Sequence, residues 1–310
     1  MAKKKEFDLR FGVSPEIPAV HDQFKVIEIN RKSIFPFGYN CSVCKFGSRT
    51  FLAYRWHEGK TWHTSLAIAE LDDKFNVKEN KRIELEGPAN DDPRLFEHSG
   101  SLYVSWVNAK SMTSTTIRYA KLIESKNWQV ENVCQVAYGR NDGTSTEKNW
   151  VPFSYGKKIH FIYRCGIDHT VIEVDNSVVI NEYKSTGAKW MYGEIRGGTV
   201  PIRSRDSWFR FYHSRLNNEG YQYPQRYYVG AMEISSSPPF NVIRNTKTPI
   251  VAGSQYDSIS NEERGKVRFW NPNTVFPLGS LRVDGGWLLS AGINHGICSI
   301  ISIKDEDIKW

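Results

Sequence analysis

The stretch Asn90-Asp91-Asp92-Pro93-Arg94-Leu95-Phe96 places two adjacent carboxylates directly before a proline and an arginine. Proline lacks a backbone donor and favours an extended conformation in the residue before it. The arginine can pair with one carboxylate and lower its pKa while the other stays free. Residues 95–106 then read as a strand, a tight turn and a second strand. Such a rigid acidic corner could hold a general acid, or it could be an Asp-Pro turn with a surface ion pair.

Length and composition indicate a globular chain with a mildly basic surface. The 310 residues suffice for one large β or α/β domain or for two ordinary domains. Hydrophobic residues make up 40% and charged residues 24%, which excludes a disordered protein. The net charge of +7 includes three lysines at positions 3–5, and no basic stripe or nucleic-acid motif follows. The surplus therefore favours a small anionic ligand, such as phosphate or a nucleotide sugar, over nucleic acid.

The sequence lacks signals for a membrane, a secretory route or a metal site. No apolar run approaches the roughly 20 residues of a membrane helix, and the charged N-terminus lacks the apolar core of a signal peptide. Cys41 and Cys44 form a C-x-x-C pair, but no second pair completes a zinc site. We therefore expect a cytoplasmic protein without membrane insertion, with reduced, half-buried cysteines in strands and no bound metal.

A recurring pattern of apolar runs and turns predicts an all-β fold. Residues 1–23 read as a loose charged arm, and residues 24–310 as one domain. Within it, apolar and aromatic runs with strand alternation are separated by turns rich in Gly, Asn and Asp, and they fall into five groups. These groups span residues 39–85, 91–136, 149–183, 197–243 and 267–303. The period predicts a single five-bladed β-propeller, with a pair of β-sandwich domains as the alternative. The early strand at residues 24–29 is expected to join the last blade and close the ring.

Polar residues at the blade starts should converge, because the first strand of each propeller blade lines the central channel. Carboxylates, amides and cations all occur there, as a sugar site with a phosphate-binding corner would need. The residues concerned are Asn40, Arg55, Asp91, Asp92, Arg94, Lys148, Arg164, Arg196, His213 and Asn294-His295.

An ordered set of short motifs makes the chain similar to a known family. The motifs are Tyr54-Arg55, Asp91-Asp92-Pro93-Arg94-Leu95, Glu147-Lys148-Asn149-Trp150-Val151-Pro152-Phe153, Tyr163-Arg164, Gly197-Gly198-Thr199-Val200-Pro201, Tyr212-His213-Ser214, Tyr228-Val229-Gly230-Ala231 and Val275-Phe276-Pro277-Leu278-Gly279. Over roughly residues 38–303, their order and spacing resemble glycoside hydrolase family 130, the β-mannoside phosphorylases and β-mannosidases. The resemblance implies a five-bladed β-propeller and a divergent member, because Asn294-His295 stands where many members carry an acidic residue.

The resemblance also implies roles for particular residues. Asp92, directly before Pro-Arg, would be the general acid, with Asp91 in place of the family's usual glutamate. The phosphate or subsite ligands would be Arg55, Lys148, Arg164 and His213, supported by Asn40, Arg94 and Arg196. The implied partners are a carbohydrate substrate and inorganic phosphate as a co-substrate, with no other cofactor. A homo-oligomer is also implied, because family members often form one.

Three functions remain open at the level of sequence. The first is inverting cleavage or phosphorolysis of a β-mannoside or related glycoside. A hydrolase then needs a carboxylate base about 6.5–9.5 Å from the acid. Glu194 is the leading candidate for that base, ahead of Glu147 and Asp168, unless it merely pairs with Arg196. The second function is glycosyl transfer from a nucleotide sugar in the same pocket, as in a mannosyltransferase. The third is a non-catalytic glycan-binding propeller.

Overall fold

The computed structural model describes residues 24–30, 32–57, 62–111, 113–217, 225–253 and 273–310. Within these ranges the protein is nearly all-β, and the helical content is a single 3₁₀ turn, η4 (Asp305–Asp307). The strands are β1 (Val26–Glu28), β2 (Tyr39–Phe46), β3 (Arg49–His57), β4 (Thr64–Leu71), β5 (Val77–Arg82), β6 (Ala89–His98), β7 (Ser101–Ser111), β8 (Ser114–Glu124), β9 (Trp128–Gln135), β10 (Val151–Tyr155), β11 (Lys158–Cys165), β12 (Asp168–Asp175), β13 (Val178–Thr186), β14 (Glu194–Gly198), β15 (Ile202–Ser204), β16 (Ser207–Asn217), β17 (Gln225–Ser235), β18 (Val242–Asn245), β19 (Val251–Ala252), β20 (Val275–Val283), β21 (Gly286–Ile293) and β22 (Ile297–Lys304).

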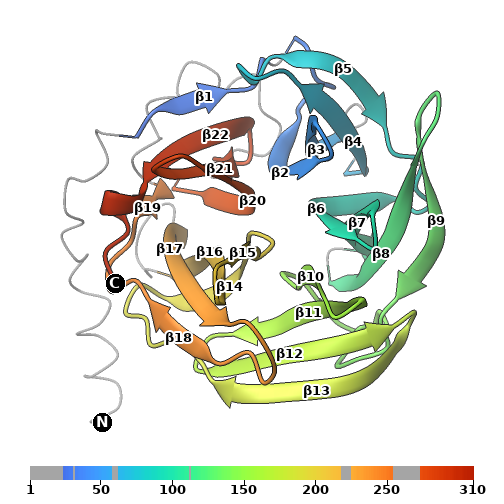
Figure 1. Ribbon diagram of the computed structural model, residues 1–310. Helices are drawn as coiled ribbons and strands as arrows, with labels where there is room; N and C mark the ends of the chain where they lie inside the picture. Colours follow the sequence, from blue (N-terminus) through green and yellow to red (C-terminus); the bar gives the residue numbers. More distant parts are fainter. Residues whose placement is uncertain (1–23, 31, 58–61, 112, 218–224, 254–272) are drawn as a thin grey trace.

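Strands that follow one another in sequence pair antiparallel and form five meanders. These are β2–β5, β6–β9, β10–β13, β14–β19, and β20–β22 with β1. A single parallel pairing of Thr64 with Ala89 joins the first two meanders into one eight-stranded sheet. Figure 1 shows the meanders arranged around a common centre, with β2, β6, β10, β14 and β20 innermost. The all-β class and the five groups expected from the sequence are thus confirmed for the described residues.

The first described strand belongs to the last meander. Strand β1 pairs antiparallel with β22, with Val26 opposite Ile301. The predicted docking of this early strand on the final group is therefore confirmed. The expected N-terminal arm, residues 1–23, lies outside the described residues, as do residues 267–272 of the fifth predicted group.

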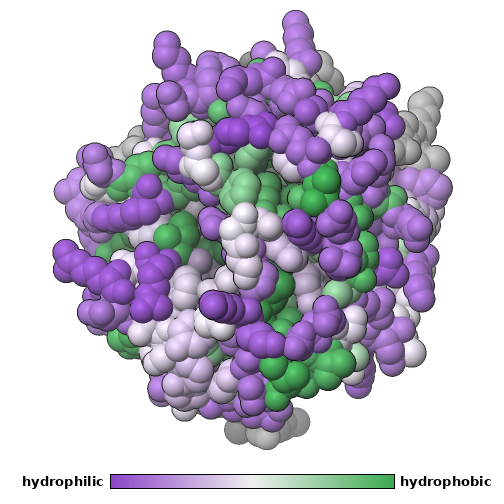
Figure 2. All heavy atoms as spheres, turned by 45° about the vertical axis from the view of Figure 1, so that its right-hand side comes forward, coloured by the Kyte–Doolittle hydropathy of each residue, from purple (hydrophilic) through white to green (hydrophobic). Residues whose placement is uncertain are grey.

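Burial decreases from the centre of the molecule to its outer edge. The inner strand β2 is fully buried over its first five residues, and β6 is buried except for Asp91 and its last two residues. The outer strands β5 and β13 are mostly exposed and rich in polar residues. Hydrophilic side chains project over the face shown in Figure 2, and hydrophobic residues show mainly between them. The sheets therefore bury most of each inner strand, and the outer strands meet water.

Each hydrophobic core lies between two neighbouring meanders. Phe209 of β16 stacks on Trp287 of β21 with 4.0 Å between ring centroids, joining the fourth meander to the fifth. Another core joins the last meander to the first, because Ile300 of β22 packs with Cys41 and Leu52 of β2 and β3. Three further cores join the first to the second, the second to the third, and the third to the fourth meander. Packing thus continues around the whole set of meanders.

The inner strands β2, β6 and β14 each carry a one-residue bulge. The pairing register slips at Asn40 in β2, between Asp91 and Arg94 in β6, and between Arg196 and Gly198 in β14. The bulge in β6 explains how Pro93 fits inside a strand, since the ladder needs no donor there. Asn40 and Asp92 have positive φ values of 50° and 51°, a conformation that Asn and Asp tolerate better than most residues. Bulges of this kind re-aim side chains, and here they direct the polar residues that the sequence singled out.

The predicted tight turn and the reduced state of the cysteines are confirmed, but the cysteines are more buried than expected. The turn between β6 and β7 has positive φ at both Ser99 and Gly100, as a tight hairpin requires. All five cysteines are free thiols, four of them buried and Cys44 half-buried. Within the described ranges no helix is long and apolar enough to cross a membrane.

Candidate active site

The two carboxylates of the acidic stretch share one arginine. The Arg55 guanidinium on β3 lies 3.0 Å from Asp91 Oδ1 and 3.4 Å from Asp92 Oδ1. Thr64 also donates a hydrogen bond to Asp91 Oδ1 at 2.7 Å. Arg55 and Asp92 are buried. A buried charge must be paired and hydrogen-bonded to be tolerated, and this cluster meets that condition.

Asp92 is held in its ionised form. Burial would raise the pKa of Asp92, but the charge of Arg55 and a 2.8 Å hydrogen bond from Asn40 Nδ2 outweigh it. The charges of Lys148 and Arg94 act in the same direction, so the pKa lies below its ordinary value. Asp92 therefore requires added negative charge nearby before it can carry a proton at neutral pH.

Arg94 does not pair with either carboxylate. Its Nε donates to the Gly198 carbonyl at 3.0 Å, and its second nitrogen reaches the Asp92 carbonyl at 3.4 Å. The expected ion pair between Arg94 and one of the two carboxylates is therefore absent from the described residues, although the charge of Arg94 does lower the pKa of Asp92. Burial places its guanidinium against backbone carbonyls, and Arg55 from the neighbouring meander takes the carboxylates. Burial also lowers the pKa of Arg94 to about 10.

A stacked aromatic group supports Arg55. The Tyr39 ring lies under the Arg55 guanidinium at 4.1 Å, a favourable cation–π arrangement. The same ring lies between the rings of His57 and His295, with centroids 5.7 and 5.8 Å away. The Tyr39 hydroxyl lies 3.0 Å from His57 Nε2. Burial raises the pKa of Tyr39 to about 12, so the phenol stays neutral beside the acidic pair.

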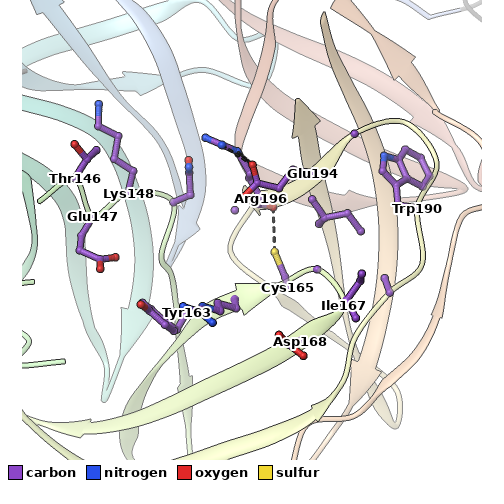
Figure 3. Close-up of a pocket in the computed structure, with 17 residues that line it drawn as sticks. Thr146, Glu147, Lys148, Tyr163, Cys165, Ile167, Asp168, Trp190, Glu194 and Arg196 are labelled. Atoms are coloured by element: carbon purple, nitrogen blue, oxygen red, sulfur yellow. Dashed lines mark hydrogen bonds and ion pairs between the residues drawn. The ribbon is translucent and has the colours of Figure 1, made fainter. Parts of the chain in front are cut away.

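A cavity of about 530 Å³ lies beside this cluster, between the third and fourth meanders. Its cationic lining residues are Lys148, Arg164 and Arg196, three of the predicted ligands for phosphate or sugar. Figure 3 places Lys148 on one side of the cavity, Trp190 and Ile167 on the other, and Arg196 between them. Multiple cations around one cavity favour an anionic ligand.

The predicted residues thus form two adjoining sets. Asn40, Arg55, Asp91, Asp92 and Arg94 form the central cluster, and Lys148, Arg164, Arg196 and Glu194 line the cavity. Lys148 links the sets, because its charge lowers the pKa of Asp92. Gly197 links them in space: it lines the cavity, and a Cβ added to it would lie 3.0 Å from Arg94.

Glu194 is occupied by an ion pair. Its Oε2 accepts hydrogen bonds from Arg196 at 2.6 and 3.1 Å, and the glutamate side chain is 68% exposed. It lies at the start of strand β14. Glu147 accepts hydrogen bonds from the Trp150 indole at 3.0 Å and from the Arg140 backbone. Asp168 is exposed at the cavity.

His213 lies in the interior of the protein, away from the cavity lining. It is fully buried on β16, and its ring packs 4.4 Å from that of Phe276. Neither ring nitrogen has a hydrogen-bond partner among the described residues. Burial, together with the charges of Arg94 and Arg196, lowers the pKa of His213 well below its ordinary value. The imidazole is therefore neutral and outside the cavity lining, and it contributes no positive charge to an anion there.

His295 gives the site a predicted sensitivity to acid. Burial and the charges of Arg55 and Lys148 lower its pKa to about 4, although Asp92 acts in the opposite direction. The unfolded chain takes up a proton near pH 6.5, so this contribution to stability is present above that pH and is lost as the pH falls towards 4. We expect a loss of at most about 3 kcal/mol from this group. In His295→Gln, thermal unfolding between pH 7 and 4 should vary less with pH; equal slopes in both proteins would contradict this.

Sequence reasoning missed several residues that shape the site. Tyr39 precedes Asn40 directly, yet no motif marked it as the aromatic ring on which the Arg55 guanidinium stacks. Gly292 was also missed, although an added Cβ there would lie only 2.1 Å from Asn40 Oδ1. A usable signal was the recurrence of Asn, Asp or Gly at the blade starts, since Asn40, Asp92 and Gly198 all adopt positive φ.

Fold and site together define an all-β protein with a buried acid beside a cationic cavity, and known proteins share this fold. No protein-family model matches the chain. A 121-residue stretch is 26% identical to a 1,2-β-oligomannan phosphorylase from a Thermoanaerobacter species. That stretch spans 39% of this chain and 36% of the relative, so about a third of the curated relative's length is matched.

Solved structures match almost the whole chain. The β-1,2-mannobiose phosphorylase of Listeria innocua has a TM-score of 0.63 at 15% identity, covering 97% of this chain and 96% of its own. The mannose phosphorylase of Leishmania mexicana, solved with a phosphate ion, has a TM-score of 0.61 at 12% identity, covering 98% and 93%. A structure from the GH130 family of mannoside phosphorylases, which contains hydrolases of β-1,2 mannosidic linkages, scores 0.63 at 12% identity, covering 87% and 84%. The resemblance to glycoside hydrolase family 130 is thereby confirmed at the level of fold.

Proposed function

We propose that this chain is a divergent member of glycoside hydrolase family 130, a five-bladed β-propeller enzyme that cleaves a β-mannoside or a related glycoside with inversion. Asp92 is the general acid, and inorganic phosphate is the nucleophile and the only co-substrate. The observation that carries this proposal is the cationic cavity lined by Lys148, Arg164 and Arg196 next to a buried aspartate. The similar folds, which include phosphorylases and hydrolases of mannosides, support the same class of enzyme.

The ion pair of Glu194 favours phosphorolysis over hydrolysis. A hydrolytic inverting enzyme needs a free carboxylate to activate water. Glu194 is neutralised by Arg196, and Glu147 is tied to the Trp150 indole. The third candidate, Asp168, is exposed at the cavity and is the carboxylate that a hydrolase would have to use. Phosphate is already nucleophilic and needs only cations to hold it, which the cavity supplies.

Phosphate also provides a way to protonate the acid. A general acid must carry its proton when the glycosidic oxygen leaves. The charges of Arg55 and Lys148 lower the pKa of Asp92, and a phosphate dianion bound beside Lys148 would offset them. Binding of the co-substrate thus favours the protonated acid, and the enzyme would become competent only when both substrates are present.

The test is a product assay with purified protein, a panel of β-mannosides, and phosphate either present or absent. We expect mannose 1-phosphate to form only when phosphate is present, and Lys148→Met to raise the KM for phosphate by at least about tenfold, since one charged contact is worth about 1.5–3 kcal/mol. Exposed Lys304→Met is the matched control and should leave the KM unchanged. Free mannose in both arms would identify a hydrolase and direct attention to Glu194 and Asp168. No product in either arm, with saturable binding of a nucleotide sugar, would identify a transferase.

A further inference from the structure

Two buried arginines meet at the Gly197-Gly198 segment of β14 without a carboxylate partner. Arg94 of β6 donates to the Gly198 carbonyl at 3.0 Å, and Arg210 of β16 donates to the Gly197 carbonyl at 2.5 Å. Arg94 is 2% exposed and Arg210 is fully buried. Among the described residues, neither guanidinium is in salt-bridge contact with an acidic side chain. The two carbonyl groups accept some of the hydrogen bonds that the guanidinium groups can donate, but they carry no negative charge to balance the two cations.

Several N–H groups around this segment have no acceptor from the described protein. They are the second terminal nitrogen of Arg94, two nitrogens of Arg210, and the one protonated ring nitrogen of His169, whose other ring nitrogen also lacks a partner. Burial and the charge of Arg210 lower the pKa of His169 to about 4, so its imidazole is neutral and has a single N–H. His169 is fully buried on β12, opposite Cys165 in the β11–β12 pair. The Cys165 thiol donates to the Arg196 carbonyl at 3.1 Å. All these groups therefore gather around residues 196–198.

The chemistry of these groups selects the ligand. A guanidinium cannot be deprotonated in a protein and can only donate hydrogen bonds. A water molecule would have to donate its own protons as well as accept, whereas an anion only accepts. Buried donors almost always have partners, and of the two cations only Arg94 lies near a negative charge, that of Asp92, which Arg55 already neutralises in part. We propose that Arg94, Arg210 and His169 bind a small inorganic anion of the chloride class behind the wall of the cavity.

Gly197 shows where the proposed anion site lies relative to the cavity. Gly197 and Cys165 also line the cavity, so the anion site lies directly behind that wall. Any side chain at position 197 would crowd Arg94 and the Asn149 carbonyl, since an added Cβ would lie 3.0 and 2.5 Å from them. Because the chain is closely packed at Gly197, we expect a single-atom ion here rather than a tetrahedral phosphate. The bound ion would connect β14 to β6, β12 and β16, and it does not depend on the proposed reaction.

The first experiment locates the ion directly in the wild-type protein. Crystals are soaked in sodium bromide, and anomalous diffraction is recorded at the bromine edge. We expect a bromide peak within hydrogen-bond distance of Arg94 and Arg210. Ordered water in that place, with no bromide, would overturn the proposal.

The second experiment measures thermal unfolding in sodium chloride and in sodium gluconate at equal ionic strength and pH. The gluconate ion is too large for the site, so we expect a Tm about 2–5 °C higher in chloride. Arg210→Met should lose this difference. Arg282→Met should keep it, because Arg282 is exposed and pairs with Asp305. The same Tm in both salts for the wild-type protein would count against the site, whether or not Arg210→Met folds.

Discussion

Asp92→Asn is expected to lower kcat on an unactivated β-mannoside by about 10²–10⁴-fold, the range that a positioned general acid contributes. The substitution preserves shape, and its amide oxygen can still accept the hydrogen bond that Asn40 donates at 2.8 Å. It removes the proton that the leaving oxygen needs. The measurement is kcat with a β-mannobiose and with a β-mannoside of an acidic phenol, in the presence of phosphate.

The comparison of leaving groups separates chemistry from structural damage. A nitrophenolate leaves without a proton, so Asp92→Asn should lose much less activity on the aryl mannoside than on the disaccharide. Asp175→Asn is the control, because Asp175 is an exposed partner of Lys158 far along β12. Equal losses of kcat on both substrates would show that Asp92 is not the general acid. Full activity of Asp92→Asn on both substrates would show that the active site does not lie at Asp92.

The second large effect is expected for Gly292→Ala in β21. An added Cβ would lie 2.1 Å from Asn40 Oδ1 and 2.8 Å from the Asn40 backbone, and backbone atoms cannot move aside cheaply. We expect a loss of about 1–3 kcal/mol in the free energy of unfolding, which is typical of overpacking. Because Asn40 holds Asp92, turnover should fall as well.

Thermal and chemical unfolding of Gly292→Ala would measure this loss. Gly166→Ala is the matched control for stability, since no atom lies within 4 Å of a Cβ added at Gly166. It should leave the free energy of unfolding nearly unchanged. If both variants unfold alike, the contact between β21 and β2 does not hold Asn40 in place.

The sequence predicted much of the fold because its signal is local. Strand alternation and turn residues are readable over a few positions, and the β6–β7 hairpin shows this with its Ser99-Gly100 turn. The pairing of Glu194 with Arg196 was also accessible, because residues two apart in a strand point to the same face.

Contacts between meanders could not be read in this way. The choice of Arg55 over Arg94 as partner of the acidic pair depends on a strand in another meander and on a bulge that shifts the register. The burial of His213 depends on Phe276, more than 60 positions later in the chain. Such outcomes follow from how the sheets pack, and a single sequence carries no local signal for them.

The core shared by the last and first meanders has a consequence for how the chain folds during its synthesis. It combines Ile29 and Cys41 with Cys298 and Ile300, which are synthesised about 250 residues later. The first meander therefore leaves the ribosome with one apolar face uncovered, and that face stays exposed until β22 has been synthesised. Long-range contacts of this kind slow folding and expose apolar surface in the meantime. We therefore expect the nascent chain to be prone to aggregation until β22 emerges and covers this face.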